Sequence, residues 1–168
     1  DAKAGRELLP LGTLEIGWYR LEFGATNQPN QAWTSLAVLR RLSKPVPADS
    51  PVAVDSAASW FAPNDAAQQK RLANLAALAG VSWVRDRLRW SEIQPEPGRL
   101  KSPPTTYDTS ADAQRDAGLQ VLQVFHDTPR WAQAVGDGGG RFAPDLRHVY
   151  ELGRQLALRF KGRVAAWE

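Results

Sequence analysis

The sequence predicts an α/β fold in which residues 52–168 form parallel strands joined by helices, preceded by a β-hairpin and a linker. Through residues 52–168, short apolar runs of strand type alternate with longer segments of helical period. Alternation of this kind is typical of parallel strands with crossover helices. Polar and charged residues also stand at the ends of the predicted strands, whereas no glycine-rich phosphate-binding motif follows any of them.

Residues 1–44 are expected to be the end of an accessory β-sandwich. Apolar and polar residues alternate over 14–23 with a change of phase near Gly17, which predicts a strand with a bulge or bend. A second strand is predicted over 33–42, after a turn at 26–31. Because two strands alone are marginally stable in water, the earlier strands of the sandwich are expected to be missing from this sequence.

Residues 45–51 contain three prolines and are expected to be a semi-rigid linker between two domains. In the domain that follows, strands are predicted to begin at 52, 81, 119 and 164, with helices over 65–79, 107–117 and 145–161. The last helix is expected to pack through an apolar face of Leu146, Val149, Tyr150, Leu156 and Phe160. The βα steps fit about half of a (β/α)8 barrel of ~250 residues. The predicted fold is therefore the first half of a TIM barrel.

The segment Gly80–Gly98 organises the candidate site. Its arginines at positions 85, 87 and 89 alternate, so they share one face of a strand as long as the chain stays extended. In a (β/α)8 barrel the site lies at the carboxyl ends of the strands. The residues at the predicted strand ends are Asp55, Arg85 with Arg87, and His126.

Composition excludes several classes of function. The net charge of +3 comes from scattered arginines with acids between them, so no Lys/Arg run suggests a nucleic-acid or membrane surface. No apolar stretch approaches the ~20 residues of a membrane span. The chain has no cysteine, and its two histidines lack metal-ligand spacing. We therefore expect neither a metal site nor a cofactor, and the absence of cysteine does not locate the protein in a compartment.

Seven tryptophans in 168 residues are a high number. Carbohydrate-binding clefts use flat aromatic faces against sugar rings, although several of the seven must simply pack in a core. The tryptophans assigned to cores are Trp18 and Trp33 in the sandwich, and Trp60 and Trp167 in the α/β domain.

Three motifs, in order and at barrel spacing, resemble clan A glycoside hydrolases. They are Trp83-Val-Arg85 with Trp90-Ser-Glu-Ile-Gln-Pro95 and Gly98, then Val124-Phe-His126-Asp-Thr-Pro129-Arg-Trp131-Ala, then Phe160-Lys-Gly-Arg-Val-Ala-Ala-Trp167-Glu168. The similarity is closest to family 39-like and related retaining enzymes. It covers residues 51–168, and the preceding hairpin is similar to the accessory β-sandwich often placed ahead of such barrels.

The resemblance implies that neither catalytic carboxylate is in this chain. In these families the general acid/base is the glutamate of an Asn-Glu pair, just beyond Glu168, and the nucleophile glutamate lies near the end of the seventh strand. Retaining enzymes hold the two carboxyl groups about 5 Å apart. The sequence also lacks methionine and ends straight after an apolar run, so we expect a piece of a longer protein. Glu168 itself is expected to be a structural partner of Arg85, because a buried charge needs a partner.

Substrate-binding roles are expected from position in the predicted fold and, for Arg85 and His126, from the resemblance. Arg85 is expected at the floor of the site, where an interior ion pair is the other reading. Trp90 is either a sugar platform or a plug over the loop, and Asp55 either contacts substrate or caps the following turn. The remaining expected contacts are Arg87 near the mouth, His126 at a strand end and Trp131 in the cleft. Arg89 is expected at the surface and His148 in a structural or surface position.

The sequence therefore predicts a retaining glycoside hydrolase that acts on a β-linked glycan or glycoside. A non-catalytic carbohydrate-binding protein is the alternative, and a TIM-barrel enzyme of different chemistry, such as a lyase, is a third. Carbohydrate is the expected partner in the first two. The oligomeric state is left open, as is the compartment, for which a secreted or periplasmic bacterial protein is one expectation.

Overall fold

The computed structural model describes residues 8–24, 32–47, 49–134 and 142–168. The chain divides into two compact units, Asp1–Ser43 and Lys44–Glu168. The turn predicted at 26–31, like a glycine-rich loop at 136–140, lies outside the described residues.

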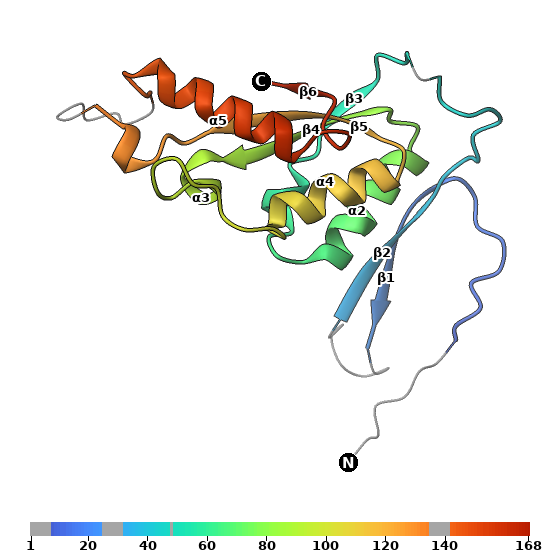
Figure 1. Ribbon diagram of the computed structural model, residues 1–168. Helices are drawn as coiled ribbons and strands as arrows, with labels where there is room; N and C mark the ends of the chain where they lie inside the picture. The colour runs from blue at the N-terminus through green and yellow to red at the C-terminus, as the bar shows by residue number, and fades with distance from the viewer. Residues whose placement is uncertain (1–7, 25–31, 48, 135–141) are drawn as a thin grey trace. The chain divides into compact units, whose positions relative to one another are not determined.

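The first unit contains an antiparallel hairpin of β1 (Gly17–Phe23) and β2 (Ala32–Val38) (Figure 1). Both strands are shorter than predicted, because the first begins only at Gly17 and the second ends at Val38. Trp18 and Trp33 are 65% and 62% exposed in this hairpin. Because a two-stranded ribbon alone covers neither of its faces, the sandwich core expected around these two residues stays a prediction.

The second unit is built on a parallel sheet in the order β3-β4-β5-β6. Its strands are β3 (Ala53–Asp55), β4 (Trp83–Arg89), β5 (Gln120–His126) and β6 (Ala166–Trp167). The crossover helices are α2 (Ala66–Leu78), α4 (Thr106–Asp116) and α5 (Leu146–Arg159). Shorter turns are α1 (Ala58–Phe61), α3 (Trp90–Ile93) and the 3-10 turn Arg130–Ala132. The predicted alternation of parallel strands and helices is confirmed.

Two of the crossover helices begin at aspartates that the sequence places at their starts. The Asp65 carboxylate accepts a hydrogen bond from the Gln68 amide ahead of α2, and the Asp145 carboxylate accepts one from the Arg147 amide ahead of α5. In contrast, the sequence did not predict α1 and α3. Each is a single turn, which is too short to produce a helical period.

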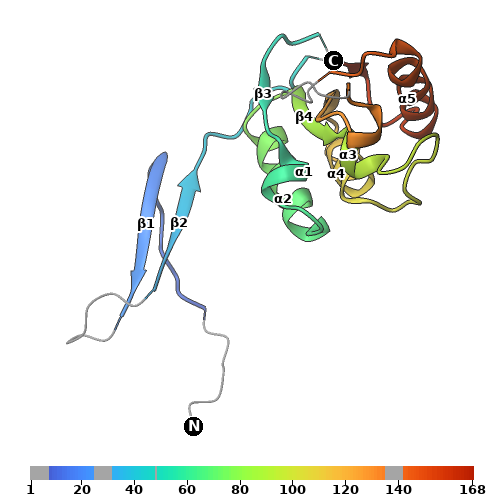
Figure 2. The same ribbon diagram turned by 90° about the vertical axis from the view of Figure 1, so that its left-hand side faces the viewer.

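The two faces of the sheet differ in burial. Figures 1 and 2 show α2, α4 and α5 on the same side of the sheet. On β4, Val84 and Leu88 are buried beneath them, whereas the arginines between these positions are only half-buried. Because partners in a parallel ladder share a face, the arginine face continues onto Asp55 of β3 and His126 of β5. This open face carries most of the residues predicted for the site.

The main core lies between the sheet and helices α4 and α5. It is formed by Leu88, Trp90, Ile93, Tyr107, Ala111, Ala132, Leu152, Leu156 and Phe160. The predicted apolar face of α5 is wrong for Leu146 and Tyr150, which are exposed. The buried stripe instead runs through Leu152, Leu156 and Phe160, which recur every four residues and therefore lie on one face of the helix.

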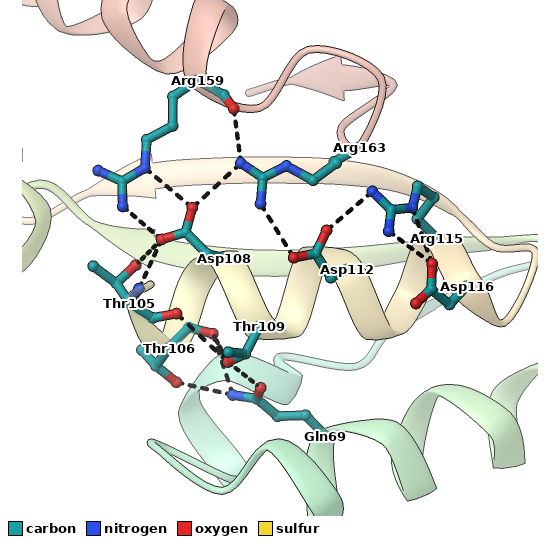
Figure 3. Close-up of polar contacts among 10 residues, drawn as sticks. All are labelled: Gln69, Thr105, Thr106, Asp108, Thr109, Asp112, Arg115, Asp116, Arg159 and Arg163. Atoms are coloured by element: carbon teal, nitrogen blue, oxygen red, sulfur yellow. Dashed lines mark hydrogen bonds and ion pairs between the residues drawn. The ribbon is translucent and has the colours of Figure 1, made fainter. Parts of the chain in front are cut away.

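A buried carboxylate, Asp108, joins α4 to α5 (Figure 3). It accepts hydrogen bonds from Arg159 Nη2 at 2.5 Å and Arg159 Nε at 3.1 Å, and Arg163 Nη2 lies 3.3 Å away. It also closes the capping box of α4, accepting from both the amide and the hydroxyl of Thr105 at 2.7 Å. Burial acts to raise the pKa of Asp108, but the hydrogen bonds from Arg159 and Thr105 outweigh burial and lower this pKa to about 2.

The lowered pKa of Asp108 predicts a specific loss of stability in acid. The usual pKa of 3.8 applies to the unfolded chain, so the carboxylate stabilises the fold above that pH and loses its contribution as the pH falls towards about 2. We expect the free energy of unfolding to fall more steeply over this range in the wild type than in Asp108→Asn. Urea unfolding at several pH values measures both slopes. An equal dependence of the free energy of unfolding on pH in the wild type and in Asp108→Asn would contradict the stabilising role of the Asp108 carboxylate.

Candidate functional site

An ion-pair network joins the middle of β4 to the carboxyl ends of β3 and β6. Arg85 contacts Glu168 with two nitrogens, Nε to Oε2 at 2.8 Å and Nη2 to Oε1 at 2.6 Å. Its third nitrogen, Nη1, lies 3.0 Å from Asp55 Oδ2. Arg87 Nη2 contacts the same oxygen of Asp55 at 2.5 Å. The structure thus brings four of the sequence-selected residues together, and we call Asp55, Arg85, Arg87 and Glu168 the strand-end network.

Sheet register explains why these residues meet. Asp55 pairs directly with Arg85 in the β3–β4 ladder, and Arg87 stands two residues further along the same face. Glu168 follows β6 and extends its pairing with β5, since its amide donates to Gln123 O at 3.0 Å and its carbonyl accepts from Phe125 N at 3.1 Å. The planar fork of a guanidinium suits Arg85 for bidentate contact with one carboxylate while it also reaches a second.

Both carboxylates of the strand-end network are held in the charged form. The hydrogen bond from Arg85 lowers the pKa of Glu168, and the hydrogen bond from Arg87 lowers the pKa of Asp55. In turn, Glu168 raises the pKa of Arg85 further above its usual range. At neutral pH the network therefore offers acceptors and cationic donors to a hydroxylated ligand, but no carboxylic proton.

A second group surrounds the indole of Trp60 at the same end of the sheet. The guanidinium carbon of Arg89 lies 4.3 Å from the ring centre of Trp60, and that of Arg87 lies 5.5 Å away. The His126 ring is 4.9 Å from the same indole, and His126 Nδ1 lies 3.0 Å from Asp127 Oδ1. Arg87 thus belongs to both groups, and His126 lies at the strand end where the sequence places it.

One prediction about this second group is wrong. Trp60 was expected in the core, but it is half-buried and contacts Arg89 beside His126. Arg89 was expected at the surface, and its side chain is 42% exposed. Trp60 lies in α1, within the connection that follows β3, and in barrel enzymes such connections build the site. Arg89 continues the alternation of Arg85 and Arg87 on the open face. The position of Trp60 after a predicted strand and the alternation of the arginines are both visible in the sequence, so they could have placed these two residues at the site.

Trp90 and Trp131 join neither group. Trp90 is 2% exposed and its Nε1 donates to Gln94 Oε1 at 2.8 Å, so the prediction of a sugar platform is wrong and a buried plug fits instead. Trp131 is half-buried, with its ring edge-on to those of Trp90 and His148 at 5.9 and 5.2 Å, and its Nε1 donates to Gln94 O. Flat stacking on a sugar needs an open ring face, which the burial of Trp90 removes.

A pocket of 560 Å³ adjoins the Trp60 group. Its walls include Trp60, Arg89, Glu92, Lys101 and Tyr107. This volume is within the range of about 300–1,000 Å³ that is usual for small-molecule sites.

The described residues contain no cluster of three or more His, Asp or Glu side chains that could hold a metal ion. Among the helices of the described part, none is long and apolar enough to cross a membrane.

The strand-end network is expected to contribute little to stability. The side chains of Arg85, Asp55 and Glu168 are 31%, 39% and 50% exposed, and ion pairs in such surroundings are screened by solvent. We predict that Glu168→Gln leaves the midpoint of urea denaturation close to that of the wild type. A large fall in the midpoint would mean that the network holds the fold together instead of serving a site.

Comparison with models of protein families and with curated proteins gives no match. Among solved structures, the chain is similar to a family 39 glycoside hydrolase from the gut symbiont Bacteroides cellulosilyticus WH2, with 24% identity and a TM-score of 0.61 over 91% of this chain and 31% of that one. It is less similar to Pseudomonas stutzeri endoglucanase Cel5A, with 18% identity and a TM-score of 0.45 over 59% of this chain and 30% of that one. The chain spans about a third of the length of either protein. Its fold is therefore like that of part of a glycoside hydrolase.

Proposed function

We propose that this chain supplies the first four strands of a (β/α)8 barrel in a retaining glycoside hydrolase that acts on a β-linked glycan or glycoside. The hairpin of residues 17–38 then belongs to an accessory β-sandwich. The observation that carries the proposal is the strand-end network, in which an arginine at the floor of the open face holds a glutamate at the end of the fourth parallel strand. The similarity in fold to a family 39 glycoside hydrolase supports it.

The network suits a supporting role in glycoside cleavage. Retaining hydrolysis needs a carboxylic acid that protonates the leaving oxygen and a carboxylate that attacks the anomeric carbon. Glu168 is ionised by its contact with Arg85 and so does not serve as the acid. Both catalytic carboxylates are proposed to lie after Glu168, the first of them on the same strand. Arg85, Arg87, Asp55 and His126 bind the sugar or orient those carboxylates.

Hydrolysis tests the proposal directly. The polypeptide encoded by the complete reading frame that contains this sequence is expected to release the aryl group from at least one aryl β-glycoside of a panel covering glucose, galactose, xylose, mannose and fucose. The 168-residue chain alone is expected to release none, because it lacks the two carboxylates. Turnover by the isolated chain that Glu168→Gln abolishes would contradict the placement of the catalytic groups, and inactivity of the complete polypeptide on every glycoside would contradict the proposed reaction.

A non-catalytic carbohydrate-binding protein remains the second candidate, and one observation favours it. Trp18 and Trp33 lie on the same face of the hairpin and are largely exposed, with the Arg20 guanidinium 5.0 Å from the Trp33 ring centre. Exposed indoles offer flat faces to sugar rings. Binding of β-linked oligosaccharides that is lost in Trp18→Ala and Trp33→Ala, without hydrolysis by the complete polypeptide, would favour this candidate.

A further inference from the structure

The pocket beside Trp60 has a composition that neither the strand-end network nor the proposed reaction explains. It lies among the loop that follows α1, helix α3 and the segment leading into α4. It is lined by Ser59, Trp60, Pro63, Asn64, Arg89, Glu92, Lys101, Ser102, Pro104, Thr105, Thr106 and Tyr107. Polar groups thus alternate with an indole, a phenol ring and two proline rings.

The pocket shares a wall with the open face of the sheet. Arg89 and Trp60 line it, and the other contacts of the Trp60 indole are His126 and Arg87. Arg87 in turn contacts Asp55 of the strand-end network. A continuous set of contacts therefore runs from the pocket to the network.

Glu92 decides which chemistry the pocket accepts. Its Oε2 accepts from the Tyr107 hydroxyl at 2.6 Å, and its Oε1 accepts from Arg89 Nη1 at 2.9 Å. Burial acts to raise the pKa of Glu92, but the hydrogen bonds from Tyr107 and Arg89 outweigh burial and lower it. Because Glu92 is paired with Arg89, the charge of this wall is largely compensated, and the wall presents hydrogen-bonding groups to a ligand.

The remaining groups match a polyhydroxylated ring. Glu92 offers acceptor lone pairs, while the ammonium of Lys101, the amide of Asn64 and the hydroxyl of Ser102 offer donors. Trp60, Pro63 and Pro104 offer apolar surface for the C–H faces of a pyranose. We propose that this pocket binds a neutral sugar unit of a β-linked oligosaccharide, one or more units away from the sugar at the strand-end network. This inference rests on the proposed function, because it takes another sugar of the same ligand to bind at the strand-end network.

Indole and amide resonances of the 15N-labelled 168-residue chain test the pocket. The Nε1–H of Trp60 is buried and has no hydrogen-bond partner within the described residues, so its resonance reports a nearby ligand. Cellobiose, xylobiose and laminaribiose are the probes, with inorganic phosphate as the competing ligand. We expect at least one disaccharide to shift the Trp60 indole and the Lys101 amide while the indoles of Trp18 and Trp33 stay unchanged.

Two substitutions and a matched control complete the test. Glu92→Gln is expected to weaken disaccharide binding about ten-fold or more, since hydrogen bonds to a charged group are worth about 1.5–3 kcal/mol. Lys101 is exposed and lies outside the core, so Lys101→Ala tests the pocket even if Glu92→Gln disturbs folding. Lys101→Ala is expected to weaken disaccharide binding about three-fold or more. Lys161→Ala, an exposed lysine outside the pocket, is expected to leave the affinity unchanged.

The outcomes separate this inference from the proposed function. Shifts confined to Trp18 and Trp33, shifts caused only by phosphate, or no shift with any disaccharide would each overturn the pocket assignment. Hydrolysis by the complete polypeptide is measured independently. Hydrolysis without any perturbation at Trp60 or Lys101 contradicts the pocket alone. Perturbation of the Trp60 and Lys101 resonances without hydrolysis supports the pocket assignment and contradicts the proposed hydrolase activity.

Discussion

Replacing Asp86 by alanine is expected to lower the free energy of unfolding by about 3 kcal/mol or more, because several buried hydrogen-bond donors lose their acceptor at once. Asp86 is 1% exposed on the helix side of β4. Its Oδ1 accepts from the amide and hydroxyl of Ser59 at 3.2 and 2.9 Å and from the Arg87 amide at 2.8 Å. Its Oδ2 accepts from the Ser110 hydroxyl at 2.6 Å and Gln114 Nε2 at 2.7 Å. One carboxylate thus ties α1 and α4 to the central strand.

The Asp86 contacts also connect stability to the site. Ser59 precedes Trp60 in the single turn of α1, so its hydrogen bonds to Asp86 fix the helix that carries the indole. In Asp86→Ala we expect the Trp60 indole resonance to broaden or move in addition to the loss of stability. Proton–nitrogen NMR spectra of the 15N-labelled variant measure the Trp60 resonance, and urea denaturation measures the stability.

Asp116→Ala is the matched control for Asp86→Ala. Asp116 is an exposed aspartate at the end of α4 whose ion pair is with Arg115, also half-exposed. Exposed pairs contribute about 0–1 kcal/mol, and a negative charge at a helix carboxyl end is unfavourable. We therefore expect Asp116→Ala to change the free energy of unfolding by less than about 0.5 kcal/mol. Equal losses in the two variants would contradict the role given to Asp86.

The second large effect is expected on catalysis. In the complete polypeptide, Arg85→Met is expected to reduce kcat/KM for an aryl β-glycoside about 100-fold, or about 2.7 kcal/mol of transition-state stabilisation. Methionine retains an apolar stem but removes the fork of donors that holds both Glu168 and Asp55. Glu168 then loses its cationic partner, while Asp55 keeps only its contact with Arg87, so the carboxylate at the floor of the site is no longer held in place.

Controls distinguish a site effect from a structural one. Arg85→Lys keeps the charge but not the bidentate geometry, so its kcat/KM is expected to fall between the wild type and Arg85→Met. Arg115→Met removes an exposed arginine of α4 that pairs with Asp112 and Asp116, and it is expected to leave kcat/KM unchanged. Wild-type kcat/KM in Arg85→Met would show that the network takes no part in the reaction.

The fold could be predicted from the sequence because its signals are local. Helical and strand periods, and the aspartates that cap α2 and α5, lie within single elements. The single-turn helices α1 and α3 were missed because one turn carries no period. The exposure of Leu146 was not predicted, because its spacing from Val149 and Tyr150 fits an apolar helix face. The face that packs against the core instead passes through Leu152, Leu156 and Phe160.

The site could be predicted only in part, for a related reason. Alternation along one strand placed Arg85 and Arg87 on a common face, and strand-end position selected Asp55 and His126. The same alternation places Asp86 on the opposite face, but its partners Ser59 and Ser110 are 27 and 24 residues away on other elements. Contacts of that range depend on how the helices pack, which no local pattern specifies.

The anomeric form of the first product tests the central claim most directly. The complete polypeptide is incubated with an aryl β-glycoside that it cleaves, and proton NMR follows the released sugar before mutarotation. A retaining barrel with two carboxyl groups about 5 Å apart predicts that the β-anomer appears first and the α-anomer only later. The α-anomer appearing first, or no sugar released from any β-glycoside, would contradict the account.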